Sequence, residues 1–317
     1  MGLPLRLLLA LASGTALAFA FPPYNLGILA WIAVALLLAV SLGVSRRAAL
    51  ACGFLHGLAF YSLTLPWIYT VMRQHGGLGR VEAGAVFAAM VAALALFPAV
   101  FAVCVAQIGL RSRARAFTAA PFLWVALELA RGHILALAFP WNLLGYAAAP
   151  YLGLLQLAAV TGIYGLSFLV AAFNALIAWV FMTGKRSSYL TGAIAAAITI
   201  SSVLVGEQFV PPEKPEFIAS LVQTNFPEVP GYAPDWMDRH AAEMDELGKI
   251  SINAEQTSRG ITIWPEVPAP FYWQDAKFSA RIRAIARATE NHVLVGIVDW
   301  KAAPGGGLMP YNTAILV

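Results

Sequence analysis

The sequence predicts a multi-pass α-helical membrane domain of about seven spans, followed by a partial α/β domain. The 317 residues are 60% hydrophobic and only 11% charged, with a mean hydropathy of +0.73. Soluble domains carry about 25% charged residues. The charge is also divided, because residues 1–205 hold eleven Lys and Arg against two acids, and residues 206–317 hold nine against fourteen. We therefore expect a transmembrane domain over 1–205 and an acidic soluble domain over 206–317.

Apolar runs in the first domain predict the spans. A membrane-crossing helix needs about 20 apolar residues, with a range of roughly 17–25. The first, second and last runs are short, and Ala18-Phe19-Ala20 resembles a signal peptidase site, although the spans that follow favour a signal anchor. The seven runs are Leu5–Ala20, Ile28–Leu42, Leu50–Tyr69, Ala83–Leu110, Phe117–Leu135, Leu154–Phe181 and Leu190–Val205.

Loop charges predict the orientation. Eight basic residues fall on one side of the predicted spans and three on the other, which places the N-terminus in the cytoplasm. Seven spans then put everything after Val205 on the outer side, in the periplasm of a bacterial inner membrane. The eight are Arg6, Arg46, Arg47, Arg111, Arg113, Arg115, Lys185 and Arg186, and the three are Arg73, Arg80 and Arg131.

Two of the predicted outer loops are rich in aromatic residues. They are Phe21–Asn25, between spans one and two, and Phe139–Tyr146, between spans five and six. Trp and Tyr favour the membrane interface, so an aromatic belt is one interpretation. The other is a lipid-facing mouth beneath the external domain.

A few polar groups lie inside the predicted spans. Glu128 is three residues before Arg131, and an ionisable residue in a membrane is a candidate functional group. The pair can meet on one helix face as a structural ion pair, or Glu128 can contact substrate. His56 is expected to be packed or hydrogen-bonded. Cys52 and Cys104 lie in apolar runs as small buried hydrophobes, without the spacing of metal ligands or a disulfide.

Composition also argues against two function classes. The basic residues are scattered over loops and form no stripe interleaved with aromatic residues, so nucleic-acid binding is not expected. A transporter would favour internal repeats or paired broken helices, and the sequence shows neither.

After a Pro-rich linker, Glu207–Glu216, the pattern changes to short strands and amphipathic helices. The order β-α-β-α-β-β suits a layered α/β sheet. The predicted strands are Phe217–Gln223, Ile261–Trp264, Val293–Val298 and Tyr311–Val317, and the predicted helices are Trp236–Ser258 and Lys277–Thr289. Pro227–Pro234 is predicted as a loop, and Gly305–Gly307 as a turn.

The second strand delivers a carboxylate just past a proline, in Ile261-Thr-Ile-Trp-Pro-Glu266. A strand end is a common place for a catalytic acid or base. Glu266 is therefore a candidate catalytic residue, and a strand-end carboxylate in a salt bridge is the structural alternative.

Four motifs in this half resemble the first half of a nitrilase (carbon–nitrogen hydrolase) domain, of αββα type. They are Leu221-Val-Gln-Thr-Asn225, Ile263-Trp-Pro-Glu266, Val293-Leu-Val-Gly296 and Tyr311-Asn-Thr313. The preceding spans, with Phe139-Pro-Trp-Asn142 and Gly162–Phe168, resemble one member of that superfamily, the apolipoprotein N-acyltransferase family. The similarity covers the whole chain, and the order of its motifs is specific.

The resemblance implies acyl transfer from a phospholipid to the α-amino group of the N-terminal diacylglyceryl-cysteine of a lipoprotein. A Glu–Lys–Cys triad works through a thioester, and the resemblance implies no cofactor and no metal. By motif match Glu266 is the general base. Trp236 resembles a functional Trp of the family and is a candidate substrate-binding residue, or it packs at a helix start. Asn312 resembles a family Asn flanking the site and is also a candidate substrate-binding residue, or it is structural.

The Lys and Cys motifs of the family, and its last span, are expected beyond Val317. Lys277 and Lys301 lack the motif context and are expected at the surface. The 317 residues by themselves are therefore expected to be inactive. The alternative hypothesis is a non-enzymatic membrane protein that retains lipid or lipoprotein binding.

Overall fold

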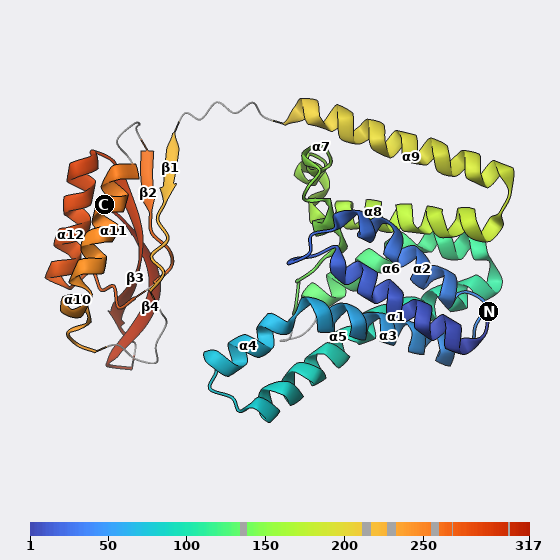
Figure 1. Cartoon of the computed structure of the whole chain (residues 1–317), viewed down its shortest axis with the longest axis horizontal. Coiled ribbons are helices and arrows are strands. Elements are labelled where there is room, and N and C mark those ends of the chain that lie inside the picture. The colour runs from blue at the N-terminus through green and yellow to red at the C-terminus, as the bar shows by residue number, and fades with distance from the viewer. Residues whose placement is uncertain (134–137, 211–216, 227–232, 255–259, 268, 304) are drawn as a thin grey trace. The chain divides into compact units, whose positions relative to one another are not determined.

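The computed structural model describes residues 1–133, 138–210, 217–226, 233–254, 260–267, 269–303 and 305–317. The chain divides into two compact units, Met1–Pro211 and Pro212–Val317. The first is helical and the second combines a sheet with helices (Figure 1). The two units are described separately below.

The helical unit follows the apolar runs. Two of its elements are 3₁₀ turns at the outer loops, η1 (Gly27–Leu29) and η2 (Leu144–Ala148), and a third, η3 (Glu207–Phe209), ends the unit. Gly162, with a φ of 63°, interrupts α8 near its start. The α-helices are α1 (Leu3–Phe19), α2 (Ala30–Ser41), α3 (Arg46–Thr64), α4 (Pro66–Gln74), α5 (Arg80–Arg111), α6 (Arg113–His133), α7 (Leu152–Leu155), α8 (Ala158–Thr183) and α9 (Arg186–Gly206).

Three described helices are long and apolar enough to cross a membrane: α5, α8, and α9 extended to Phe209. Helices α3 and α4, which meet at a bend of 51°, would make a fourth if they form one span. Helices α1 and α2 are shorter apolar helices. The prediction of a helical membrane domain is therefore confirmed, whereas the number of seven spans stays a prediction.

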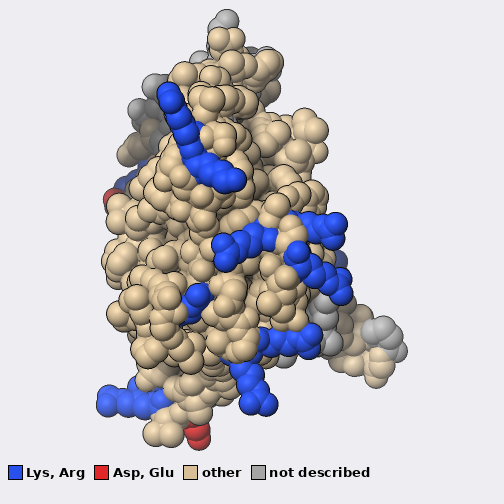
Figure 2. Space-filling view, turned by 90° about the vertical axis from the view of Figure 1, so that its right-hand side faces the viewer, with Lys and Arg blue, Asp and Glu red and all other residues tan. Residues whose placement is uncertain are grey.

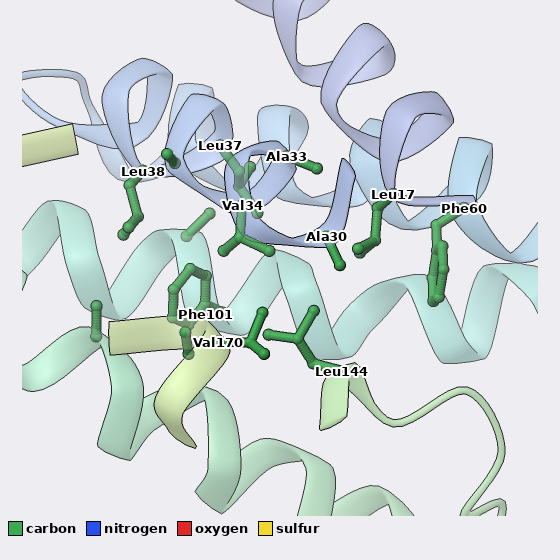
Figure 3. Close-up of a cluster of buried hydrophobic side chains, with 14 of the residues drawn as sticks. Leu17, Ala30, Ala33, Val34, Leu37, Leu38, Phe60, Phe101, Leu144 and Val170 are labelled. Atoms are coloured by element: carbon green, nitrogen blue, oxygen red, sulfur yellow. The ribbon is translucent and has the colours of Figure 1, made fainter. Parts of the chain in front are cut away.

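Small residues allow the helices of this unit to approach closely. Gly53 and Gly57 on α3 face α5, and a Cβ atom on Gly53 would stand 2.3 Å from the carbonyl oxygen of Pro98. One on Gly57 would stand 2.6 Å from the Cα of Ala95. A G-x-x-x-G spacing of this kind is typical of helix packing in membranes. Around this contact lies the buried core drawn in Figure 3, with side chains from α1, α2, α3, α5 and α8 and from η2.

Basic side chains gather at one end of the helical unit (Figure 2). Arg6 on α1 donates hydrogen bonds to the carbonyl oxygens of Val40 (2.6 Å) and Leu42 (3.0 Å) at the end of α2. Arg46 at the start of α3 donates to Gln107 near the end of α5 (2.6 Å). The helix ends that carry these basic residues therefore lie together, as the loop pattern predicted.

The second unit is a four-stranded sheet with helices on one face (Figure 1). Strands β1, β2 and β3 are parallel neighbours, and β4 pairs antiparallel with β3. The core between sheet and helices contains Met244, Phe278, Ile282, Val293 and Val295. The elements are β1 (Ile218–Leu221), α10 (Trp236–Arg239), α11 (Ala241–Ala254), β2 (Gly260–Ile263), α12 (Ala276–Thr289), β3 (His292–Ala302) and β4 (Leu308–Leu316).

The predicted order β-α-β-α-β-β is confirmed, but several boundaries differ, and β1 is shorter than the predicted Phe217–Gln223. The helix predicted from Trp236 breaks at His240, and its predicted end, residues 255–258, lies outside the described residues. Strands β3 and β4 are longer than predicted because Gly306 and Gly307, with φ of 89° and 87°, close a tight turn between them. The predicted linker prolines, Pro211, Pro212 and Pro215, and most of the loop Pro227–Pro234 also lie outside the described residues.

Candidate functional site

Glu266 lies just past the carboxyl end of β2. The backbone N–H of Val222 donates to the carbonyl oxygen of Ile263 (2.9 Å), and that of Trp264 donates to Leu294 on β3 (2.9 Å). The strand pairing therefore extends to the residues next to Glu266, whose side chain is exposed. The carboxyl edge of parallel strands is where ligands commonly bind in open α/β sheets.

The chain passes over β3 directly at Glu266. A Cβ atom on Gly296, in the middle of β3, would stand 2.6 Å from the carbonyl oxygen of Pro265 and 2.8 Å from the Cα of Glu266. Only glycine leaves room for that approach. Val267 follows with a φ of 25°, which is strained for a β-branched residue. The position of Glu266 is therefore fixed where the backbone of Pro265 and Glu266 packs across Gly296 of β3.

Asn312 reaches Glu266 from the far strand. It lies on β4 opposite Val298 of β3, and its side-chain N–H donates to Oε1 of Glu266. A donor aimed at a carboxylate fixes the orientation of that carboxylate. The structure thus brings together two of the four residues singled out from the sequence.

Trp236 belongs to the core of the second unit. It is 7% exposed, its ring stacks on His240 (4.2 Å between centroids), and it meets Phe226 and Phe271 edge-on. Phe271 lies five residues after Glu266, and the N–H of Val298 donates to its carbonyl oxygen (2.9 Å). Trp236 therefore supports the segment that follows Glu266.

Lys277 and Lys301 are at the surface of this unit. Lys277 pairs with Asp238 on α10, and its side chain is 64% exposed. Lys301 lies 3.7 Å from Asp299 and over the ring of Tyr311, with 61% of its side chain exposed. Neither contacts Glu266 within the described part of the chain, as expected for surface residues.

In the helical unit, the two aromatic loops meet. A groove of about 600 Å³ is formed between them. This proximity favours the second interpretation of the loops, a mouth, over two separate anchors in an aromatic belt. Its lining residues are Ala20, Phe21, Pro22, Asn25, Gly27, Pro140, Trp141, Asn142, Tyr146, Ala147, Ala149 and Pro150.

Glu128 and Arg131 hold one wall of that groove. Glu128 is 5% exposed and accepts from the backbone N–H of Leu144 (2.7 Å) and from Trp124 Nε1 (2.9 Å). Arg131, 4% exposed, donates to the carbonyl oxygens of Phe139 (3.2 Å) and Trp141. Among the described residues no salt bridge joins the two side chains, and both interpretations of Glu128, ion pairing and substrate contact, stay predictions. The loop backbone offers closer partners than the i,i+3 neighbour does.

The remaining polar candidates of the helical unit are internal. His56 is buried and shares a hydrogen bond with Ser13 (2.9 Å), as predicted for a hydrogen-bonded core histidine. Cys52 is fully buried and Cys104 partly so, and both are free thiols. Within the described residues no cluster of three or more His, Cys, Asp or Glu is placed to hold a metal ion.

The sequence of the chain is similar to those of known proteins. Residues 13–176 match the family described as the apolipoprotein N-acyltransferase N-terminal domain. An apolipoprotein N-acyltransferase of Geobacter metallireducens is 33% identical over 98% of this chain and 60% of its own length. One from Methylococcus capsulatus is 30% identical over 93% of this chain and 58% of its own length.

The chain belongs to the apolipoprotein N-acyltransferase family. A third relative so named, from Nitrosomonas europaea, is 27% identical over 97% of this chain and 60% of its own length. The chain therefore spans about three fifths of these curated N-acyltransferases. The family resemblance found in the sequence motifs is confirmed.

Three structural features of this chain were not predicted from its sequence. The sequence did not predict that Gly296 makes room for the backbone at Glu266, although a glycine within a strand often marks a close backbone approach. The strain at Val267 has no sequence signal. Asn142 adopts a φ of 52°, and asparagine tolerates this left-handed conformation better than most residues.

Proposed function

We propose that the protein is an N-acyltransferase that moves an acyl chain from a phospholipid to the α-amino group of the N-terminal diacylglyceryl-cysteine of a lipoprotein. Family membership supports this class of reaction. The observation that supports a catalytic role for a particular residue is the orientation of the Glu266 carboxylate. It lies past the end of β2 and is held by Asn312 and by the backbone crossing at Gly296.

Glu266 is the proposed general base. A carboxylate that accepts a hydrogen bond on one oxygen keeps a fixed lone pair on the other. That lone pair can take a proton from a nucleophile and return it to a leaving group. The resemblance implies that a Lys and a Cys act with Glu266 in the family's triad.

Asn312 is the proposed positioning residue for Glu266, because it touches the carboxylate and not the reacting atoms. Trp236 keeps two roles open in this proposal, direct contact with substrate and support of the segment after Glu266. Its burial against Phe271 favours support.

The groove between the two aromatic loops is the proposed entry for lipid. Its lining is largely apolar, with Trp141 and Tyr146 half or nearly half exposed. Such side chains suit the boundary between acyl chains and headgroups. Glu128 then acts by holding the groove wall through Leu144, and we propose this in place of direct substrate contact.

We also propose a bacterial inner membrane location, with the N-terminus cytoplasmic and the sheet-containing unit periplasmic. The basic end of the helical unit supports this, since cytoplasmic loops carry the excess of Lys and Arg. Accessibility of single cysteines placed at Arg47 and at Tyr24 to a membrane-impermeant reagent tests it. Labelling from the cytoplasmic side at residue 24 contradicts it.

The role of Glu266 is tested in the full-length protein with labelled phospholipid and a diacylated lipopeptide. Glu266→Gln is expected to abolish acyl-enzyme formation, because an amide cannot accept the proton. Glu246→Gln is the matched control, an exposed carboxylate on α11 of the same unit. Near-normal turnover in Glu266→Gln with unchanged folding contradicts the role given to Glu266. Binding of both lipids without any turnover in the unmodified protein favours the non-enzymatic alternative.

A further inference from the structure

A small cavity lies within the helical unit. Its volume is about 30 Å³, and Leu17, Phe60, Phe101 and Leu144 form part of its apolar wall. These four side chains are labelled in the core of Figure 3. Side chains with polar groups also line it: His56, Tyr61, Trp124, Glu128, Arg131 and Asn142.

Three buried polar atoms in that lining have no hydrogen-bond partner among the described residues. They are Nε2 of His56, Oε2 of Glu128 and Nδ2 of Asn142. Leaving such an atom unpaired costs about 1–3 kcal/mol. Most buried polar atoms in proteins are paired, so three orphans around one cavity point to a shared partner.

The hydrogen-bond network fixes what each orphan needs. Ser13 has one hydroxyl hydrogen, which it donates to the carbonyl oxygen of Ala33 (2.7 Å), so its oxygen accepts from Nδ1 of His56. The neutral imidazole therefore presents Nε2 as an acceptor. Oε2 of Glu128 is also an acceptor when its carboxylate is ionised, while Nδ2 of Asn142 is a donor. One partner for all three atoms must therefore both donate and accept hydrogen bonds.

Water meets these requirements and few other molecules do. One water can donate to His56 and Glu128 and accept from Asn142, and buried waters typically make about three hydrogen bonds. A bound water needs about 10–15 Å³ of such space, so the cavity admits one or two. An ammonium ion has no acceptor for Asn142, an inorganic anion would face the Glu128 carboxylate, and an acyl chain satisfies none of the three atoms.

We propose that this cavity binds one or two water molecules that bridge His56 on α3, Glu128 on α6 and Asn142 in the loop before η2. Asn142 and Phe21 line both this cavity and the groove between the aromatic loops. The water therefore ties the groove wall to the helical core, in addition to the bonds from Arg131 and Glu128. Exchange with solvent would pass between those two shared residues.

A structure of the full-length protein in lipid nanodiscs, at a resolution that shows ordered water, tests the proposal directly. Density for one or two waters within hydrogen-bond distance of Nε2 of His56 and Oε2 of Glu128 is expected. A dry cavity, a bound ion, or direct hydrogen bonds between these side chains would overturn it.

Infrared difference spectra in H₂¹⁸O and H₂¹⁶O supply the second test. A buried water gives an isotope-sensitive O–H band, which should be lost in His56→Asn. Asparagine keeps a donor near the Nδ1 position for Ser13 but removes the atom at Nε2. The control is His133→Asn, the same change at an exposed histidine, and it should keep the band.

Asn142→Asp serves if His56→Asn does not fold. Aspartate also tolerates the left-handed backbone at residue 142, but it replaces the donor with a third acceptor, so the band should shift or vanish. A band that persists unchanged in these variants, or one that is absent from the unmodified protein, contradicts the bridging water.

Discussion

Glu266 and Gly296 lie in backbone contact, and the contact requires that residue 296 have no side chain. A Cβ atom there would stand 2.8 Å from the Cα of Glu266. Glu266 follows β2, and Gly296 lies on the neighbouring parallel strand β3, 30 positions later in the chain. The crossing brings the carboxylate of Glu266 within reach of Asn312 on β4. The position of Glu266, the proposed base, thus depends on residue 296 having no side chain.

Gly296→Ala is therefore expected to impair acyl transfer more than stability. The new methyl must push Pro265 and Glu266 away, and overpacking of this kind costs about 1–3 kcal/mol. Denaturant unfolding measures the stability, and acyl-enzyme formation in the full-length protein measures the displacement of Glu266. Gly305→Ala is the control, because a Cβ atom there meets open space. Unchanged acyl transfer in Gly296→Ala would show that the crossing does not matter.

Asn312→Ala removes the hydrogen bond to Glu266. Hydrogen bonds to charged groups contribute about 1.5–3 kcal/mol, so turnover is expected to fall roughly 10- to 100-fold. The KM for either lipid should change little, because Asn312 positions the base and does not bind substrate. Steady-state kinetics separate the two constants, with Asn253→Ala on α11 as the control. A change confined to KM argues instead for substrate contact.

Substitution of Trp236 decides between its two proposed roles. Trp236→Ala should destabilise the second unit by about 3–5 kcal/mol, the usual cost of emptying a buried aromatic site. Trp236→Phe keeps most of the packing against Phe226 and Phe271. If Trp236 only packs, the Phe variant restores both unfolding midpoint and turnover. Restored stability without restored turnover assigns it to the substrate site.

Arg131→Lys tests the groove wall. Nη1 of Arg131 donates to two carbonyl oxygens of the loop, Phe139 and Trp141, from a rigid planar guanidinium that the compact, flexible ammonium of lysine does not match. We expect a lower thermal midpoint in detergent and faster proteolysis within residues 138–143. Arg113→Lys, at an exposed helix start, should do neither. An unchanged cleavage rate in Arg131→Lys would remove the loop-holding role.

The two cysteines of the chain are expected to stay unacylated. Cys52 is fully buried on α3, and apolar surroundings disfavour the thiolate that attacks an ester. These 317 residues, incubated with labelled phospholipid and a diacylated lipopeptide, should therefore carry no thioester. Mass spectrometry detects the adduct, and an acyl group on Cys52 or Cys104 contradicts the assignment.

Local patterns in the sequence were enough for the fold class and the element order. Apolar runs and their length predict helices that need no long-range information, because each satisfies its own backbone hydrogen bonds. The strand pattern ending in Trp264-Pro-Glu266 predicted a carboxylate at a sheet edge, and the structure has it there. Helix breaks were predicted less well: the bend between α3 and α4 falls at Pro66, inside the predicted span Leu50–Tyr69, and the helix predicted from Trp236 breaks at His240.

The sequence by itself determined the division of charge, the membrane-type helices and the identity of Glu266 as a candidate base. Only the tertiary structure decided which residues act together. Asn312 meets Glu266 across β3, Glu128 and Arg131 bind loop backbone rather than each other, and His56 shares a cavity with Asn142. These contacts join residues that are distant in the chain. Which side chains meet depends on how the backbone packs, and not on which polar residue is nearest in the sequence.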